Sequence, residues 1–246
     1  MREWIYGRNP VYELLRAGRR EGFRLLVAEG VKSKGQLVNI LNLCKNKNIP
    51  IEFAPRTQLD SIQPNNQGVL LEASGYPYVS LPDIFDLSEQ RTESPLILIL
   101  DTLQDPQNLG TLLRTAEVVG VHGVLLPFRR TATVTPAVVN ASSGASEHLL
   151  ITQVNLAQAI NTIKERDIWV IGFDSGPDTQ LLEKRALSGP IALVIGAEGE
   201  GMRTLVRKSC DQLIRLPMRG RIESLNAAVA GSIALYLAWE ARGYNH

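Results

Sequence analysis

The sequence predicts an α/β protein whose larger, C-terminal part is built around a mostly parallel sheet. Short apolar runs alternate with amphipathic segments along most of the chain, which is the pattern of strands joined by helices. One run, LILIL at 96–100, is apolar at every position, as in a strand that is buried on both faces of a sheet. Ligands of parallel sheets bind at the carboxyl ends of the strands, so the loops that follow the strands are the candidate sites.

Composition narrows the class of protein. Of the 246 residues, 44% are hydrophobic and 21% are charged, a globular balance that excludes disordered, collagen-like and coiled-coil chains. The longest nearly uncharged stretch, 226–239, is shorter than the ~20 apolar residues of a membrane span, and the first ten residues lack the apolar core of a secretion signal. Two cysteines are too few for a disulfide framework or a four-cysteine zinc site. We therefore expect a soluble, cytoplasmic protein with neither a membrane contact nor a metal.

Residues 1–75 are expected to form a small α/β domain. Apolar spacing predicts helices at 10–17, 35–44 and 57–62, and strands at 24–28, 49–53 and 68–71. This segment carries 11 Lys and Arg against 7 Asp and Glu, a net charge of +4, whereas the remainder carries −3. The asymmetry is typical of a basic part that meets phosphates, and a chance fluctuation of surface charge explains it equally well. The stretch 76–95, which mixes proline and charge, is predicted to be a linker.

Residues 96–246 form the second predicted domain, in which strands and helices alternate more regularly. Strands are predicted at 96–100, 123–126, 150–154, 168–173, 191–195 and 212–216, and helices at 109–119, 136–146, 156–166, 202–208 and 225–241. This alternation indicates a mostly parallel sheet, but the order of its strands cannot be read from periodicity.

The first candidate loop is DTLQDPQNLGTLLRTA, 101–116, directly after the LILIL strand. Asp105 and Pro106 signal a turn, and Asn108 is predicted to cap the helix that follows. Arg114 then lies one or two turns inside that helix. A capped helix with a surface arginine explains these residues without a ligand, although a helix N-terminus behind a parallel strand is also a natural anion site.

The second candidate loop is IGAEGEGM, 195–202, again between a strand and a helix. Its glycines are spaced G-x-x-G-x-G, which matches neither a Walker phosphate loop nor the dinucleotide fingerprint. Glu198 and Glu200 would repel a pyrophosphate, so a nucleoside or sulfonium ligand is favoured over a di- or triphosphate.

The third candidate loop is LPMRGRIESLNAAVAGSIALYLA, 216–238. Arg219 and Arg221 flank a glycine, Ser224 is predicted to cap the last helix, and that helix is rich in Ala and Gly. Small residues allow close packing against another backbone, so this helix belongs to a core or an interface whether or not its start also binds a ligand.

Several catalytic schemes are excluded by missing motifs. The chain has no G-x-S-x-G, H-E-x-x-H or C-x-x-C sequence, and its three histidines are too scattered for a metal cluster. Neither cysteine lies in a strand-end loop beside a base, which argues against a thiolate nucleophile.

Together and in this order, the three loops resemble the SpoU (TrmH-type) branch of the SPOUT methyltransferases. These enzymes transfer a methyl group from S-adenosylmethionine to a ribose 2′-hydroxyl of RNA. The matching stretches are DPQNLGTLLRTA, LVIGAEGEGM and LPMRGRIESLNAAVA, with VTPAVVNASSGASEH between the first two. The start, YGRNPVYELLRAG, more loosely resembles the family's small RNA-binding domain of the L30e/L7Ae kind. With this domain included, the nearest resemblance is to the 23S rRNA (guanosine-2′-O-)-methyltransferases.

The resemblance implies a deep trefoil knot in the C-terminal domain, a homodimer, and a cofactor held by the knotted loops. Periodicity could not predict the knot, since knots run against the usual topological rule. By the same resemblance, Gly196, Leu216 and Leu225 would contact S-adenosylmethionine, largely through backbone groups. The active-site positions of the family fall on Asn108, Arg114, Glu198, Ser224 and Asn226.

The role of Arg114 has two readings. The family's mechanism gives this position the general base, but a guanidinium loses its proton only above a pH of about 12. We therefore favour Arg114 as the group that holds a phosphate and the developing alkoxide, with Asn108 orienting it. The role of Glu198 is to orient neighbouring groups around the cofactor.

Three hypotheses for the function follow. The first is a guanosine 2′-O-methyltransferase of 23S rRNA, which the L30e-like start favours. The second is a tRNA 2′-O-methyltransferase, and the third is a non-catalytic RNA-binding protein with the same fold. The complete set of active-site residue types speaks against the third, and a dehydrogenase is disfavoured because the dinucleotide fingerprint is missing.

Overall fold

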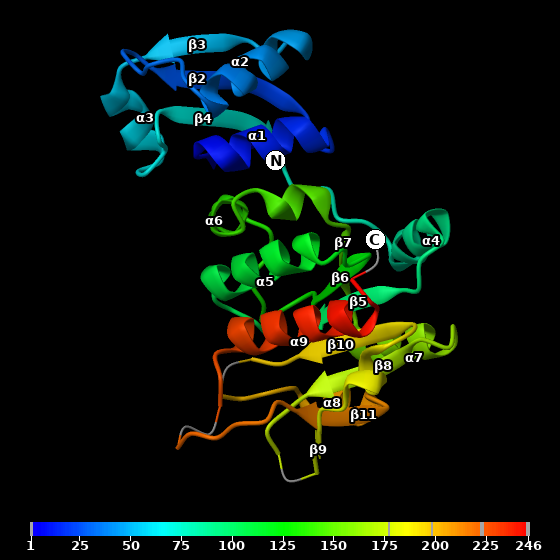
Figure 1. Cartoon of the computed structure of the whole chain (residues 1–246). Helices are drawn as coiled ribbons and strands as arrows, with labels where there is room; N and C mark the ends of the chain where they lie inside the picture. Colours follow the sequence, from blue (N-terminus) through cyan, green and yellow to red (C-terminus); the bar gives the residue numbers. More distant parts are fainter. Residues whose placement is uncertain (1, 177, 198, 222–223, 245–246) are drawn as a thin grey trace. The chain divides into compact units, whose positions relative to one another are not determined.

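The computed structural model describes residues 2–176, 178–197, 199–221 and 224–244 (Figure 1). The chain divides into two compact units. Unit 1 comprises Met1–Pro77 together with Val134–His148, and unit 2 comprises Tyr78–Thr133 together with Leu149–His246. Each unit is described by itself below.

Unit 1 is a small α/β sandwich around a four-stranded sheet in the described part of the chain. Its elements up to residue 77 are β1 (Arg2–Tyr6), α1 (Arg8–Ala17), β2 (Gly22–Ala28), α2 (Gln36–Asn46), β3 (Ile51–Ala54), α3 (Arg56–Ile62) and β4 (Val69–Ser74). The strand order is β1-β4-β2-β3, with β4 antiparallel to both neighbours and β2 parallel to β3. The expected helices and strands are present, and β1 is an additional strand that sequence periodicity did not predict.

The segment Val134–His148 belongs to unit 1 although it lies far along the chain. It contains α6 (Pro136–Ala141) and the 3-10 turn η1 (Ala145–His148). The helix predicted at 136–146 is thus shorter, because Ser143 and Gly144 adopt left-handed backbone conformations with φ of 55° and 90°. A Cβ at Gly144 would lie 2.7 Å from the Cβ of Glu13, so glycine allows the segment to approach α1 closely.

A buried polar cluster fastens this segment within unit 1. The guanidinium of Arg20 lies 3.0 Å from Oε1 of Glu147 and donates to Oε2 of Glu3 at 3.1 Å. The Tyr76 hydroxyl donates to the carbonyl of Ser146 at 3.1 Å. Because these partners come from both ends of the unit's sequence, residues 1–77 alone would leave the Arg20 side chain without its main carboxylate.

Unit 2 is a three-layer α/β structure around a seven-stranded sheet, as far as the chain is described. Its elements are α4 (Leu81–Arg91), β5 (Leu96–Leu100), α5 (Pro106–Val118), β6 (Gly123–Pro127), β7 (Ile151–Val154), α7 (Leu156–Lys164), β8 (Trp169–Phe173), β9 (Gln180–Leu181), η2 (Lys184–Leu187), β10 (Ile191–Ile195), α8 (Thr204–Ser209), β11 (Gln212–Arg215) and α9 (Ala227–Ala241). The strand order is β7-β6-β5-β10-β8-β11-β9, and every neighbouring pair is parallel. The predicted mostly parallel sheet is confirmed.

Helices cover both faces of this sheet (Figure 1). Side chains of α4, α7 and α8 pack on one face against alternate residues of β5 and β10, including Ile97 and Val194. On the other face, α9 packs on α5 and β10 so closely that a Cβ at Gly231 would lie 2.5 Å from a methyl carbon of Leu112. The Ala- and Gly-rich composition of α9 therefore serves helix packing, as its small residues suggested.

The stretch 76–95 differs from the linker that its composition predicted. Residues 81–91 form α4, whose N-cap Ser80 exchanges hydrogen bonds with Asp83 in a capping box. Proline near the first turn of a helix is compatible with helical structure, so the proline content of this stretch was misleading. The short edge strand β9 was also not predicted, since two residues carry no periodicity.

Candidate functional site

A cavity of about 890 Å³ opens at the carboxyl ends of β8, β10 and β11 in unit 2. Three loops line it, in agreement with the rule for parallel sheets. All three residues predicted to contact a cofactor, Gly196, Leu216 and Leu225, line this cavity. The volume lies within the range of pockets that hold small organic ligands.

The loop after β10 owes its shape to glycines. Ala197 and Gly201 exchange two backbone hydrogen bonds, of 3.0 and 2.9 Å, which close the loop on itself. A Cβ at Gly196 would lie 2.3 Å from the carbonyl carbon of Gly201, so no other residue fits at this crossing without moving backbone. Gly199 and Gly201 have positive φ angles of 79° and 67°.

Asn108 and Asn226 are brought together from positions 118 residues apart. The Nδ2 group of Asn226 donates to Oδ1 of Asn108 at 3.0 Å. The Oδ1 atom of Asn226 accepts from the backbone N–H groups of Ala228 and Val229, at 2.9 and 3.2 Å. These bonds determine the orientation of the Asn226 carboxamide, because one end is needed by the helix and the other by Asn108.

The helix caps differ from the prediction by a few residues. Asp105 caps α5 by accepting from the backbone N–H groups of Gln107 and Asn108, at 3.1 and 3.2 Å. Asn108 therefore lies inside the first turn of α5 rather than at its cap. Asn226, not Ser224, caps α9. In both cases a better-placed Asx side chain nearby takes the cap, and the predicted capping residue remains available for another role.

The remaining predicted active-site residues are more spread out. Ser224 is exposed and lines the cavity just before α9. Arg114 is exposed on α5, six residues after Asn108, which corresponds to about 9 Å along the helix axis. Glu198 lies outside the residues that the structure describes.

Two aspartates at strand ends were not singled out from the sequence. Asp101 follows β5 and is 0% exposed, and its carboxylate accepts hydrogen bonds from the backbone N–H and Nε of Arg203 at 2.8 and 2.7 Å. Asp174 follows β8 and lines the cavity. A usable signal was present, since each aspartate directly follows an apolar strand at the edge where parallel sheets bind ligands.

The cavity wall is acidic at Asp174 and Glu200. Burial alone would raise the pKa of Asp174, but hydrogen bonds from Arg207 and from the N–H groups of Ser175 and Gly176 outweigh burial and lower it. Asp174 therefore stays ionised at neutral pH, and its charge is balanced by Arg207, whose Nε lies 2.6 Å from Oδ2.

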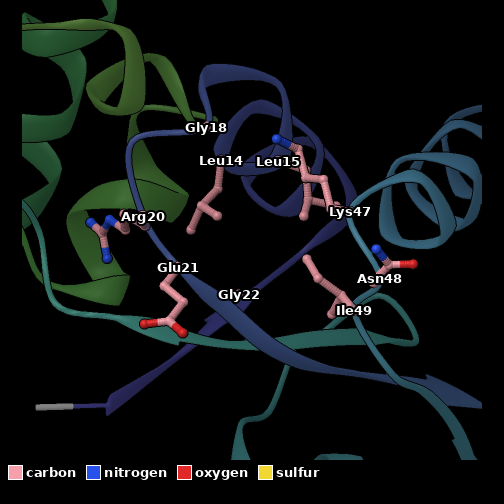
Figure 2. Close-up of a pocket in the computed structure, with 9 residues that line it drawn as sticks. All are labelled: Leu14, Leu15, Gly18, Arg20, Glu21, Gly22, Lys47, Asn48 and Ile49. Carbon is pink, nitrogen blue, oxygen red and sulfur yellow. The ribbon is translucent and has the colours of Figure 1, made fainter.

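A second cavity, of about 430 Å³, lies in unit 1 (Figure 2). Its lining residues are Leu14, Leu15, Gly18, Arg20, Glu21, Gly22, Lys47, Asn48 and Ile49. Figure 2 shows the Arg20 side chain directed away from Leu14 and Ile49, consistent with its ion pairs to Glu3 and Glu147. The one buried cation of this lining is thus already engaged elsewhere, and its other charged residues, Glu21 and Lys47, are exposed.

Metal and thiol chemistry have little support in the described residues. No cluster of His, Cys, Asp and Glu among them could hold a metal ion, and none of their helices is both long and apolar enough to cross a membrane. Burial raises the pKa of Cys44 to about 11 and that of Cys210 to about 12, so both thiols stay protonated near neutral pH.

Comparison with known proteins agrees with this geometry. Residues 95–236 match the SpoU rRNA Methylase family, and residues 4–79 match the family described as RNA 2′-O ribose methyltransferase substrate binding. A Bacillus subtilis (strain 168) protein named as a TrmH family tRNA/rRNA methyltransferase, YacO, is 41% identical over 244 residues, which cover 98% of this chain and 96% of YacO.

Solved structures share the fold over nearly the whole chain. The SpoU methyltransferase AviRb from Streptomyces viridochromogenes, crystallised with AdoMet, matches with a TM-score of 0.80 and 21% identity, over 99% of this chain and 92% of AviRb. An AdoMet-bound rRNA methyltransferase from Sinorhizobium meliloti matches with a TM-score of 0.76 and 23% identity, over 97% and 87% of the two chains.

The chain belongs to the SpoU family of RNA methyltransferases. It is an S-adenosylmethionine-dependent RNA 2′-O-methyltransferase of the SpoU/TrmH type, with the SPOUT fold in unit 2. The predicted family and cofactor are thereby confirmed, whereas the trefoil knot and the individual site residues stay predictions of the resemblance.

Proposed function

We propose that the chain methylates the ribose 2′-hydroxyl of a guanosine in 23S rRNA, in the cytoplasm. The observation that supports an RNA substrate is the match of residues 4–79 to a substrate-binding domain of RNA 2′-O-ribose methyltransferases. The resemblance of this domain to the L30e/L7Ae kind favours rRNA. A tRNA substrate is the alternative, because the relative YacO is named as a methyltransferase of tRNA or rRNA.

The basic residues of unit 1 support an RNA contact there. Most of its arginines are paired with carboxylates, for example Arg24 with Glu72 at 2.7 Å. The exposed lysines Lys32, Lys34, Lys45 and Lys47 instead lie in the loop before α2 and around its end. We propose that these lysines meet the phosphates, since exposed cations bind RNA backbone without regard to sequence. Unit 1 would then serve as the substrate-binding domain, and unit 2 as the methyltransferase domain.

We place the cofactor in the cavity of about 890 Å³ in unit 2. Its backbone-rich wall at Gly196, Leu216 and Leu225 fits a nucleoside. When bound, S-adenosylmethionine supplies an activated methyl group on a positive sulfonium that leaves as a neutral thioether. The residues around the cavity have mainly to position the ribose and to favour loss of its hydroxyl proton, and positioning supplies up to ~7–11 kcal/mol.

The Asn226–Asn108 pair orients one polar group toward the substrate in this proposal. Since Oδ1 of Asn108 accepts from Asn226, its Nδ2 group is the end that a substrate oxygen can approach. Arg114 holds a phosphate and stabilises the developing alkoxide through its charge. Ser224 lies at the cavity wall beside Leu225 and contributes a hydroxyl to the same place. For Glu198 we keep the expected orienting role.

We also propose that two copies of the chain form a homodimer through α9. Val229, Ile233 and Tyr236 are spaced as one face of a helix and are 46%, 39% and 47% exposed. The opposite face of α9 is buried against α5 and β10, so this apolar stripe has no role in the core of unit 2. A second copy is the occupant that the family resemblance implies, and light scattering should give the mass of two chains.

The reaction is tested with methyl-labelled S-adenosylmethionine and, separately, unmodified large-subunit rRNA and bulk tRNA. Methylated riboses are then mapped as alkali-resistant dinucleotides. Label confined to one alkali-resistant dinucleotide of rRNA, in which guanosine carries the methylated ribose, would support the proposal. Label in tRNA alone would replace it with the alternative, and binding of RNA and cofactor without any transfer would indicate a non-catalytic RNA-binding protein.

Arg114→Ala is the matched variant for this assay. We expect it to lower turnover by about 10³-fold, because a charge aimed at the transition state is lost, while cofactor affinity changes by less than about threefold. A large loss of cofactor affinity would contradict the proposed role, since Arg114 would then act in the binding of S-adenosylmethionine.

A further inference from the structure

Two aspartate–arginine pairs flank the cofactor loop in unit 2. Asp101 follows β5 and Asp174 follows β8, and β10 lies between these two strands in the sheet. The loop after β10 runs from Gly196 to Met202 and leads into α8. Asp101 bonds Arg203, the N-cap residue of α8, and Asp174 bonds Arg207 within α8. The end of the loop that leads into α8 is therefore held from both sides of β10.

Asp101 is the more buried of the two aspartates, at 0% exposed against 17% for Asp174. Oδ2 of Asp101 accepts from the backbone N–H of Arg203 at 2.8 Å and Oδ1 accepts from Nε at 2.7 Å, while Nη2 of the same guanidinium forms an ion-pair contact with Oδ1 at 2.7 Å. The backbone N–H of Asp101 donates to the carbonyl of Ile195 at 2.8 Å. Residue 101 therefore contacts the last residue of β10 and the first residue after the loop, and so brackets the loop.

Because the Asp101 carboxylate is buried, it requires polar or charged donors around it. The Asp101 side chain is 0% exposed, and a buried carboxylate is tolerated only when charged or strongly polar donors surround it. Two hydrogen bonds and a further ion-pair contact from one arginine supply those donors. Such a pair has one favourable arrangement, which makes it suited to hold a loop in a single conformation.

Asp174 itself lines the cavity. Oδ2 of Asp174 accepts from Nε of Arg207 at 2.6 Å, while Oδ1 accepts from the backbone N–H groups of Ser175 and Gly176 at 2.7 and 3.3 Å. The same carboxylate thus shapes the turn after β8 and ties it to α8. Arg203 and Arg207 are four residues apart, so they project from one side of α8 toward the two aspartates.

We infer that Asp101–Arg203 and Asp174–Arg207 are positioning pairs that hold the Gly196–Met202 loop and the turn after β8 in the cofactor-binding conformation before the cofactor arrives. This inference rests on the cofactor site proposed above. Loop ordering that is completed during folding does not have to be supplied by the ligand, so affinity is higher.

The test measures S-adenosylmethionine affinity calorimetrically on the full-length chain without RNA. We expect Asp101→Asn to weaken binding by about tenfold or more. Arg203→Lys keeps the charge and the backbone hydrogen bond but loses the hydrogen bond from Nε, so it should weaken binding by a smaller factor. Asp174→Asn should lie between wild type and Asp101→Asn. At saturating cofactor, kcat should recover to within about threefold of wild type, because none of these residues touches the reacting atoms.

Hydrogen exchange supplies a second readout. In the cofactor-free state, the amides of 196–202 should exchange faster in Arg203→Lys than in wild type, and bound cofactor should reduce the difference. The matched control is Glu89→Gln, which removes an exposed ion pair of unit 2, to Arg166 at 3.3 Å, and should change neither readout.

The outcomes separate the inference from the proposed function. If wild type binds S-adenosylmethionine and both Arg203→Lys and Asp174→Asn bind it equally well, the positioning role is overturned, even if Asp101→Asn does not fold. Loss of kcat that saturating cofactor does not restore would also overturn it. If the wild-type chain itself binds no S-adenosylmethionine, the proposed cofactor site fails instead.

Discussion

Two ion pairs that join segments distant in the sequence, Asp101–Arg203 and Arg20–Glu147, differ in how far they are buried and in how many hydrogen bonds they make. Asp101 and Arg203 in unit 2 share two hydrogen bonds and a further ion-pair contact, and the Arg203 side chain remains 44% exposed. Arg20 and Glu147 in unit 1 are 0% and 1% exposed, with a closest approach of 3.0 Å. Yet Nε and Nη2 of Arg20 and both carboxylate oxygens of Glu147 make no hydrogen bond to any described residue.

The difference shows that burial and hydrogen bonding are separate properties of an ion pair. Burial raises the pKa of Glu147, although the positive charges of Arg20 and Arg19 act in the opposite direction. The Arg20–Glu147 pair therefore contributes little net stability as a pair, but each member is costly without the other. In unit 2, by contrast, the exposed arginine keeps part of its hydration while the buried aspartate is fully satisfied.

The largest effect is expected when the less satisfied pair is broken. Glu147→Ala leaves the Arg20 guanidinium buried with Glu3 as its remaining carboxylate, and should destabilise unit 1 by about 3–5 kcal/mol. Urea unfolding of the full-length chain in a Trp169→Phe/Trp239→Phe background, where fluorescence comes from Trp4, measures this change. The double variant Arg20→Met/Glu147→Leu should recover most of the loss. A single variant that costs less than about 1 kcal/mol would show that the pair is solvated and would remove the contrast with Asp101–Arg203.

A neutral link in unit 2 gives an intermediate effect. Asn226→Ala removes both the cap of α9 and the bond to Asn108, and should cost about 1–2 kcal/mol of stability. Asn226→Asp retains an acceptor for the cap but cannot donate to Asn108. We therefore expect near wild-type thermal stability together with a clear loss of kcat for the aspartate variant. Equal loss of kcat and stability in both variants would mean that the link serves only the helix.

The smallest expected effect is on the pH dependence of stability, and it comes from His122, a buried histidine that stays neutral. Nδ1 of His122 accepts from the backbone N–H of Leu96 at 3.0 Å, and Nε2 lies 3.0 Å from Oε2 of Glu93. Burial lowers the pKa of His122 below 6.5, outweighing the attraction of Glu93. The unfolded chain then binds a proton more readily than the folded one, so stability is lost as the pH falls below about 6.5.

His122→Asn isolates this contribution. Asparagine retains an acceptor near the Nδ1 position but does not titrate, so the melting temperature of the variant should fall less between pH 7 and pH 5.5 than that of wild type. Parallel pH profiles of the two proteins would contradict a neutral buried histidine. His122 would then be stabilised by Glu93 as an ion pair, in the manner of Arg20 and Glu147.

Local patterns were sufficient for much of the fold. The strands predicted at 96–100 and 191–195 agree with β5 and β10 residue for residue, because a fully buried parallel strand is an uninterrupted apolar run. The helix within 76–95 escaped prediction because proline in a first turn looks like a loop signal in sequence. Edge strand β1 escaped because its apolar residues Trp4, Ile5 and Tyr6 are consecutive and do not alternate with polar ones.

The candidate site divides in the same way. Gly196, Leu216 and Leu225 were placed at one cavity by the rule that loops after parallel strands converge, together with the family resemblance. The hydrogen-bond partners of Asn226, Asp101 and Asp174 could not be predicted in this way, because each bond joins residues that lie far apart in the sequence. Their hydrogen bonds exist only because the strand order β5-β10-β8 places the ends of these strands together.

The sequence by itself thus determined the α/β class, the strands of the parallel sheet, the three loops and the family, because these depend on local periodicity and on short motifs. Only the tertiary structure decided that Val134–His148 packs within unit 1, that Asn226 orients Asn108, and that two aspartates hold α8. The physical reason is that side-chain pairing across long sequence separations follows from strand order and burial, and the hydrophobic pattern that drives folding leaves both unspecified.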